Sequence, residues 1–142
     1  MTRLSAIRAK LLDASPGAIP ALVNARIFTS RLPDDVTFPC IVLHELVADH
    51  LLTLTGGAAM CDCLIQIGCM AKGSGAELAV QELAEAVRNQ MSTFTGDLSI
   101  GVRGHVFGYR ERAMPPEVQA DRKFVHRIDC DVDIQIEESN PS

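Results

Sequence analysis

Residues 59–91 have the sequence AMCDCLIQIGCMAKGSGAELAVQELAEAVRNQM, in which two different hydrophobic periods follow one another. Over residues 59–72 the apolar side chains fall on odd positions, as in a strand with one buried face. From Ala76 the apolar period changes to that of a helix, and Ser74 with Glu77 matches a helix-capping pair. We therefore predict a strand over 59–72 and a capped helix that ends near Ser92 and packs on a sheet.

The flanking sequence contains further elements of the same kinds. Apolar spacing predicts a first helix capped by Thr2, and Pro20 fits the first turn of a short helix over 18–23. Four more strands are predicted, over residues 26–29, 40–49, 98–106 and 123–137. The last two alternate, whereas 40–49 is apolar on both parities and is expected to be covered on one or both faces. Residues 50–58, which include Gly56-Gly57, and residues 111–121 are expected to be loops.

This order of elements predicts an α+β fold. We expect a mainly antiparallel four- to five-stranded sheet with two main helices packed on one face. The 142 residues fit a single domain spanning residues 1–142, in which residues 137–142 form a flexible tail.

Composition limits the functional classes. The chain has a formal net charge of −5 and 47% hydrophobic residues, which is typical of a globular protein and argues against a general nucleic-acid binder. Residues 1–5 lack the apolar block of a signal peptide, so we expect a protein made in the cytoplasm.

Five cysteines, an odd number, suggest no disulfide framework. Cys61, Cys63 and Cys69 invite a metal-site hypothesis, but they share the apolar parity of one strand with Ile65 and Ile67. Structural zinc sites usually place their ligands in loop knuckles. We therefore predict that the cysteines fill the core as small apolar side chains.

The predicted last strand carries the one unusual electrostatic feature: a row of carboxylates from Asp129, Asp131, Asp133 and Glu137. Carboxylates two residues apart lie on one face of a strand and repel each other. Three interpretations are open: a solvated face, a divalent metal site, or the lining of a channel through which DNA passes without sticking. The third interpretation requires an assembly.

No arrangement for catalysis is visible in the sequence. The four histidines are scattered, and His126 lies on the apolar parity of the last strand, where a core or interface role is expected. The glycines match neither a phosphate-binding loop nor a dinucleotide fingerprint. We predict no enzyme and no cofactor, and keep a small metal-dependent enzyme built on Asp129, Asp131, Asp133 and a histidine as the least favoured alternative.

Several short motifs, taken in order, resemble the tail-completion or tail-terminator proteins of long-tailed bacteriophages and gene transfer agents. The resemblance extends from about Leu4 to Ile136 and lies in the spacing of its parts. These parts are Leu22 to Phe28, Leu32-Pro33, Phe38-Pro39 before an apolar strand, Gly56-Gly57, the strand with Gln66, and the helix from Ala76 to Arg88.

This resemblance implies a structural virion protein. Such a protein assembles as a ring, typically a hexamer, on the end of the tail tube, stops tube polymerisation and joins the tail to the head. The implied partners are further copies of the chain, the tail tube protein and the head–tail connector, with DNA passing through the ring and no membrane involved. A head-side connector or neck protein is the alternative. The resemblance implies no catalytic residues, metal or cofactor, and ring formation would join two different patches of neighbouring copies.

Overall fold

The computed structural model describes residues 3–13, 19–51, 58–99 and 101–139. The elements follow the order α1 (Arg3–Leu11), α2 (Ile19–Val23), β1 (Ile27–Thr29), β2 (Cys40–Leu51), β3 (Ala58–Lys72), α3 (Ala76–Met91), β4 (Thr95–Ser99), β5 (Val102–Val118) and β6 (Phe124–Ser139). The predicted α+β class is confirmed. The predictions for Thr2 and Gly56-Gly57 lie outside the described residues.

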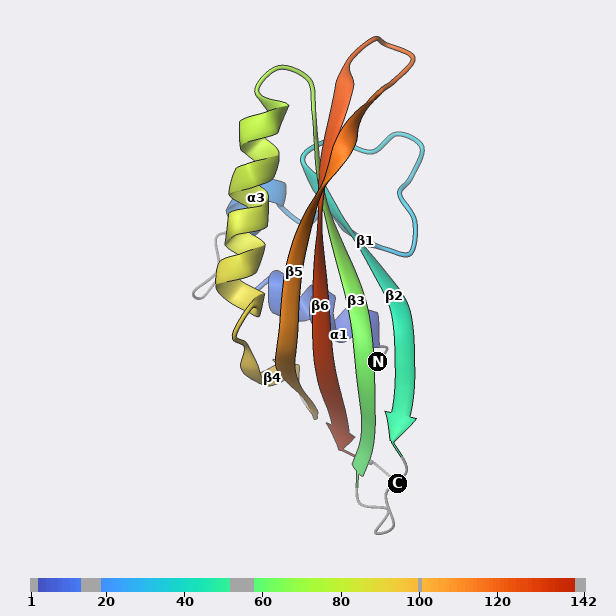
Figure 1. Cartoon of the computed structure of the whole chain (residues 1–142), viewed down its shortest axis with the longest axis vertical. Helices are drawn as coiled ribbons and strands as arrows, with labels where there is room; N and C mark the ends of the chain where they lie inside the picture. The colour runs from blue at the N-terminus through green and yellow to red at the C-terminus, as the bar shows by residue number, and fades with distance from the viewer. Residues whose placement is uncertain (1–2, 14–18, 52–57, 100, 140–142) are drawn as a thin grey trace.

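The six strands form one sheet in the order β1-β2-β3-β6-β5-β4 (Figure 1). Strand β1 pairs with β2 in parallel, and all other neighbours are antiparallel. The sheet is therefore mixed and has more strands than the predicted four to five. The difference lies at β4, because the single strand predicted over 98–106 is divided between β4 and β5.

Helices α1 and α3 pack on one face of this sheet, which we call the helix-covered face (Figure 1). The odd residues of β3 and the even residues of β6 supply its centre, because partners such as Ile65 and Val132 lie side by side across the ladder. Ile7 and Leu11 of α1 and Leu83 of α3 are fully buried against them. The apolar side chains predicted to share one face of each helix are therefore the ones buried in the core.

The start of α3 differs from the sequence-based prediction. Its N-cap is Gly75, in the left-handed conformation with φ 77°, and no side chain caps the helix. The predicted capping pair of Ser74 and Glu77 was therefore wrong. Glycine adopts this conformation without the steric cost of a Cβ atom, so the backbone itself makes the sharp turn from β3 into the helix.

Two segments predicted to be irregular are strands. Strand β5 continues through most of the predicted 111–121 loop, because a bulge between Met114 and Glu117 accommodates Pro115-Pro116. Strand β6 continues to Ser139, so residues 137–139 belong to the sheet and not to a loose tail. Together β5 and β6 form a long hairpin whose tip extends past the N-terminal end of α3 (Figure 1).

None of the helices in the described part of the chain is long and apolar enough to cross a membrane.

Candidate assembly surface

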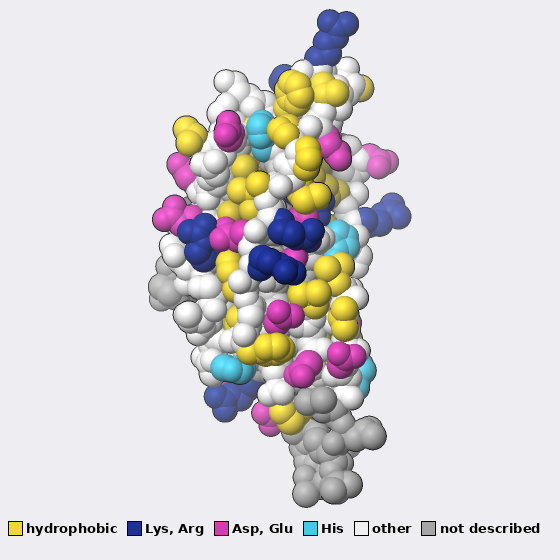
Figure 2. Space-filling view, in the orientation of Figure 1, with side chains coloured by type: hydrophobic (Ala, Val, Ile, Leu, Met, Phe, Trp, Pro, Cys, Tyr) yellow, Lys and Arg dark blue, Asp and Glu magenta, His cyan; other side chains and the backbone are white. Residues whose placement is uncertain are grey.

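On the second face of the sheet, the part of the chain that the structure describes places no helix, and we call it the helix-free face. Strand alternation directs the even residues of β3 and the odd residues of β6 onto it. Figure 2 shows this face, where arginine and acidic side chains gather over the middle of the sheet with hydrophobic side chains around them. The predicted acidic row of β6 lies here.

Two of the four carboxylates of the acidic row are buried, so the interpretation as a plain solvated face does not hold for Asp129 and Asp131. Asp129 and Asp131 are only 3% and 5% exposed. Asp129 accepts a hydrogen bond from Arg127 Nε at 2.6 Å, and Asp131 accepts from Arg112 Nε at 3.1 Å. The second guanidinium, of Arg110, lies 3.8 Å from Asp131. Burial of these carboxylates is tolerated because each has a cationic partner.

Two glycines make room for this layer of charged side chains. A Cβ atom on Gly68 would lie 2.8 Å from the Arg127 guanidinium, which crosses β3 at this point. A Cβ atom on Gly108 would lie 2.6 Å from the carboxylate of Asp133. Both distances are too short for a real side chain, so glycine allows the charged groups to lie flat on the sheet.

The arginines were missed by sequence reasoning, although a signal was present. Arg110 and Arg112 are two residues apart, as are Asp129 and Asp131, and the hairpin register places these two pairs opposite each other. The loop predicted over residues 111–121 excludes Arg112 from the strand, so this match could not be recognised. The remaining predicted residues, Asp133 and Glu137, are respectively half-buried and exposed on the same face.

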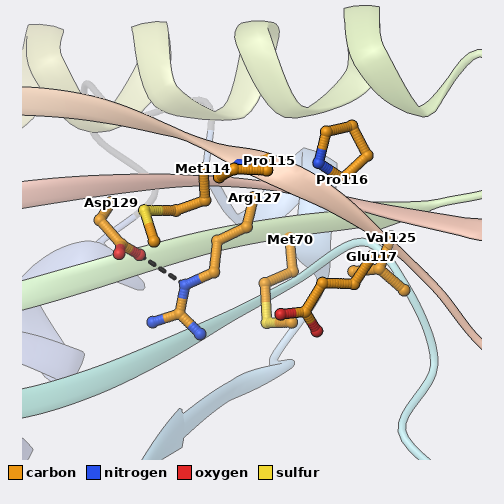
Figure 3. A pocket seen from close by; sticks show the side chains of 8 residues that line it. All are labelled: Met70, Met114, Pro115, Pro116, Glu117, Val125, Arg127 and Asp129. Atoms are coloured by element: carbon orange, nitrogen blue, oxygen red, sulfur yellow. Dashed lines mark hydrogen bonds and ion pairs between the residues drawn. The ribbon is translucent and has the colours of Figure 1, made fainter.

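A pocket of about 360 Å³ opens on the helix-free face near the tip of the hairpin. Its apolar walls come from Met70 of β3 and from Met114 and Pro115 of β5, and the Arg127–Asp129 pair closes one side (Figure 3). Beyond it, the hairpin exposes Val118 and Phe124. An apolar pocket beside exposed apolar side chains is typical of a surface that contacts another protein.

The cysteines are confirmed as core residues. All five are buried and free, and four of them belong to the main hydrophobic cluster. Burial raises the pKa of the Cys40 thiol to about 11 and, as the largest of several causes, that of Cys63 to about 12. Both thiols therefore stay protonated near neutral pH, whereas metal binding and nucleophilic attack need the thiolate.

The hypothetical enzyme site does not assemble. Within residues 3–13, 19–51, 58–99 and 101–139, no three His, Cys, Asp or Glu side chains converge in a way that would hold a metal ion. Two of the three aspartates, Asp129 and Asp131, are instead paired with arginines, and Asp133 lies against Gly108. His126 is partly buried beside α3 and lines a second pocket with Val80 and Ile128.

The whole fold recurs in a virion particle. A chain of a solved structure described as the virion of a native gene transfer agent particle has a TM-score of 0.57 to this chain. The similarity covers 97% of this chain and 95% of that chain, with 20% sequence identity. This chain therefore shares its fold with a chain of that virion particle.

A protein-family model identifies the family of the chain. The model of the tail completion protein gp17 matches residues 5–107, which is most of the chain. The chain belongs to the tail completion protein gp17 family, and it is a structural protein of a virion tail. This assignment confirms the resemblance recognised in the sequence. No curated protein matches the chain.

Proposed function

We propose that this protein caps the end of a tail tube, ends tube polymerisation and forms, as a ring, the surface that joins tail to head. The observation that carries the proposal is its membership of the tail completion family over residues 5–107. The proposed partners are other copies of the chain, the tail tube protein and the head–tail connector.

The β5–β6 hairpin supports this proposal from the structure. It projects past the N-terminal end of α3 (Figure 1). Near its tip it exposes Met114, Val118 and Phe124. Exposed apolar side chains on a projecting element favour contact with a partner. Pro115 and Pro116 restrict the backbone of the free hairpin, so less conformational entropy is lost when the hairpin binds. We propose that the hairpin contacts either the tube or the connector.

A deletion of the gene tests the proposal. Particles made without the protein should contain tails of irregular length that fail to join heads, and expression in trans should restore both properties. Tails of normal length that join heads would overturn the proposal. Protein bound to capsids of a tail-less mutant would instead favour a head-side connector.

A Val118→Asp variant tests the role of the hairpin. The variant should fold normally, because Val118 is exposed, but should complement the deletion poorly. A Leu78→Asp variant places the same charge at an exposed site on α3 and should complement fully. Equal complementation by both variants would remove the hairpin from the proposed contact.

We also propose that the helix-free face, with Asp129, Asp131, Asp133 and Glu137, lines the channel through which DNA passes. Because Asp129 and Asp131 are paired with arginines, this face would present little net charge and would not hold a polyanion. Glu137 is exposed and adds local repulsion.

The channel proposal predicts that Glu137→Lys slows DNA exit without preventing assembly, since the new cation attracts phosphate. Glu82→Lys is the matched control, because Glu82 lies exposed on α3, on the other side of the sheet. DNA release from assembled particles would be measured for both variants. Equal release rates would contradict a channel location for this face.

A further inference from the structure

The two edges of the sheet are stepped, because each outermost strand covers only part of its neighbour. Strand β1 pairs only with Ile41–Leu43 of β2, although β2 continues to Leu51. Strand β4 pairs only with residues 102–105 of β5, although β5 continues to Val118. Among the described residues, long parts of β2 and β5 therefore have a strand partner on one side only. Open edges of this kind are sites where another chain can pair.

The two steps lie at opposite ends of the sheet. Across the ladders, β1 is level with residues 111–113 of β5, which pair with no described strand on their outer side. Strand β4 is level with residues 49–51 of β2, where β1 is missing. Figure 1 shows this arrangement, with β1 high on one edge and β4 low on the other. The two edges therefore have complementary shapes: if two copies lie side by side, the outermost strand of each edge faces the uncovered part of the other.

Apolar side chains mark the middle of both edges. A bulge in β2 includes Leu46 and Val47, which are 49% and 46% exposed. A bulge in β5 includes Phe107, which is 56% exposed. The registers place these two bulges on the same row of the sheet, because Val47, Leu64, Asp133 and Gly108 are successive partners. A bulge usually discourages edge pairing, but these bulges present apolar groups that favour burial.

We propose that a second copy of this chain occupies each stepped edge, so that the β4–β5 edge of one copy joins the β1–β2 edge of the next. Strand β4 would lie beside the open end of β2, β1 would lie beside the open part of β5, and Phe107 would contact Leu46 and Val47 in the space between them. Repetition of this heterologous contact closes a ring in which the sheets are continuous. The inference rests on the proposed ring and adds the way in which its subunits join.

Strand directions are compatible with this joint. Strands β2 and β5 run in opposite directions, since three antiparallel ladders separate them. Rotation about an axis along the strands preserves these directions. The β1–β5 contact would therefore be antiparallel and the β4–β2 contact parallel, and the sheet already contains ladders of both kinds.

Charge substitutions at the two bulges test the joint. Leu46→Asp and Phe107→Lys should each leave the subunit folded and shift the assembled protein to monomer, measured by light scattering and by complementation. A chain carrying both changes should recover assembly, because the aspartate and the lysine then meet at every junction. Leu78→Asp on α3 is the control and should assemble as the unchanged protein does. Normal assembly of both single variants would overturn the proposal.

Cross-linking in assembled particles separates this inference from the function on which it rests. Particles carrying both Val47→Cys and Phe107→Cys, treated with a short bismaleimide, should give a ladder of covalent multimers. Each single variant should remain monomeric, because the native cysteines are buried. Protein that is present in tails but forms no ladder would overturn the joint while leaving the tail function intact. Absence of the protein from tails would overturn both.

Discussion

The two faces of the sheet are built from the same strands but are held together by different forces. On the helix-covered face, alternate residues of β3 and β6 are apolar and are buried by α1 and α3. On the helix-free face, the intervening residues form arginine–aspartate pairs and border an apolar pocket. Hydrophobic burial on the helix-covered face therefore provides most of the folding stability, so the side chains of the helix-free face are not needed to form the core.

Truncation of a side chain on the helix-covered face should have the largest effect. Leu83 of α3 is fully buried, so Leu83→Ala should lower the free energy of unfolding by about 2–5 kcal/mol. Leu78→Ala is a matched control on the same helix, because Leu78 is 68% exposed, and should change stability by less than about 0.5 kcal/mol. Chemical denaturation would measure both. Similar losses for the two variants would show that α3 does not pack as described.

Loss of a paired charge on the helix-free face should have an intermediate effect. Arg127→Met leaves the buried Asp129 carboxylate without its cation and should cost about 1–3 kcal/mol in unfolding free energy. Arg103→Met is the control, since Arg103 and Asp97 form an exposed pair 3.6 Å apart, worth at most about 1 kcal/mol. Denaturant titrations of the two variants test this difference. No loss for Arg127→Met would mean that the buried pairs contribute nothing to folding.

The smallest effect concerns the thiols, whose ionisation should not change the free energy of unfolding at neutral pH. The pKa of Cys63 rises from its ordinary value of 9.0 to about 12 in the folded protein, chiefly because of burial. The unfolded state therefore loses this proton first, so the contribution to stability is complete below pH 9.0 and disappears as the pH rises through about 12.

A Cys63→Val variant removes this titration while keeping an apolar side chain. The stability difference between the two proteins should be constant from about pH 6 to 8 and should then move in favour of the variant as the unfolded thiol ionises. Denaturation curves at a series of pH values would measure it. A difference that stays constant up to pH 12 would contradict a protonated, buried Cys63.

The accuracy of sequence reasoning also differs between the two faces. The helix-covered face was predictable because a buried face imposes a period on each strand and helix, as the stripe from Ala76 to Met91 shows. The helix-free face was not, because a carboxylate such as Asp131 looks solvated until its partner strand is known. The long loop predicted over 111–121 separated it from Arg112, and two successive prolines concealed the continuing strand.

The α+β class, the apolar faces of α1 and α3, the burial of the cysteines and the family resemblance were all predictable from the sequence, because they depend on local periodicity and on the order of motifs along the chain. The six-strand order, the stepped edges and the pairing of Asp129 and Asp131 with arginines became visible only in the folded structure. These features depend on the register between strands, which brings together residues that are far apart in the chain.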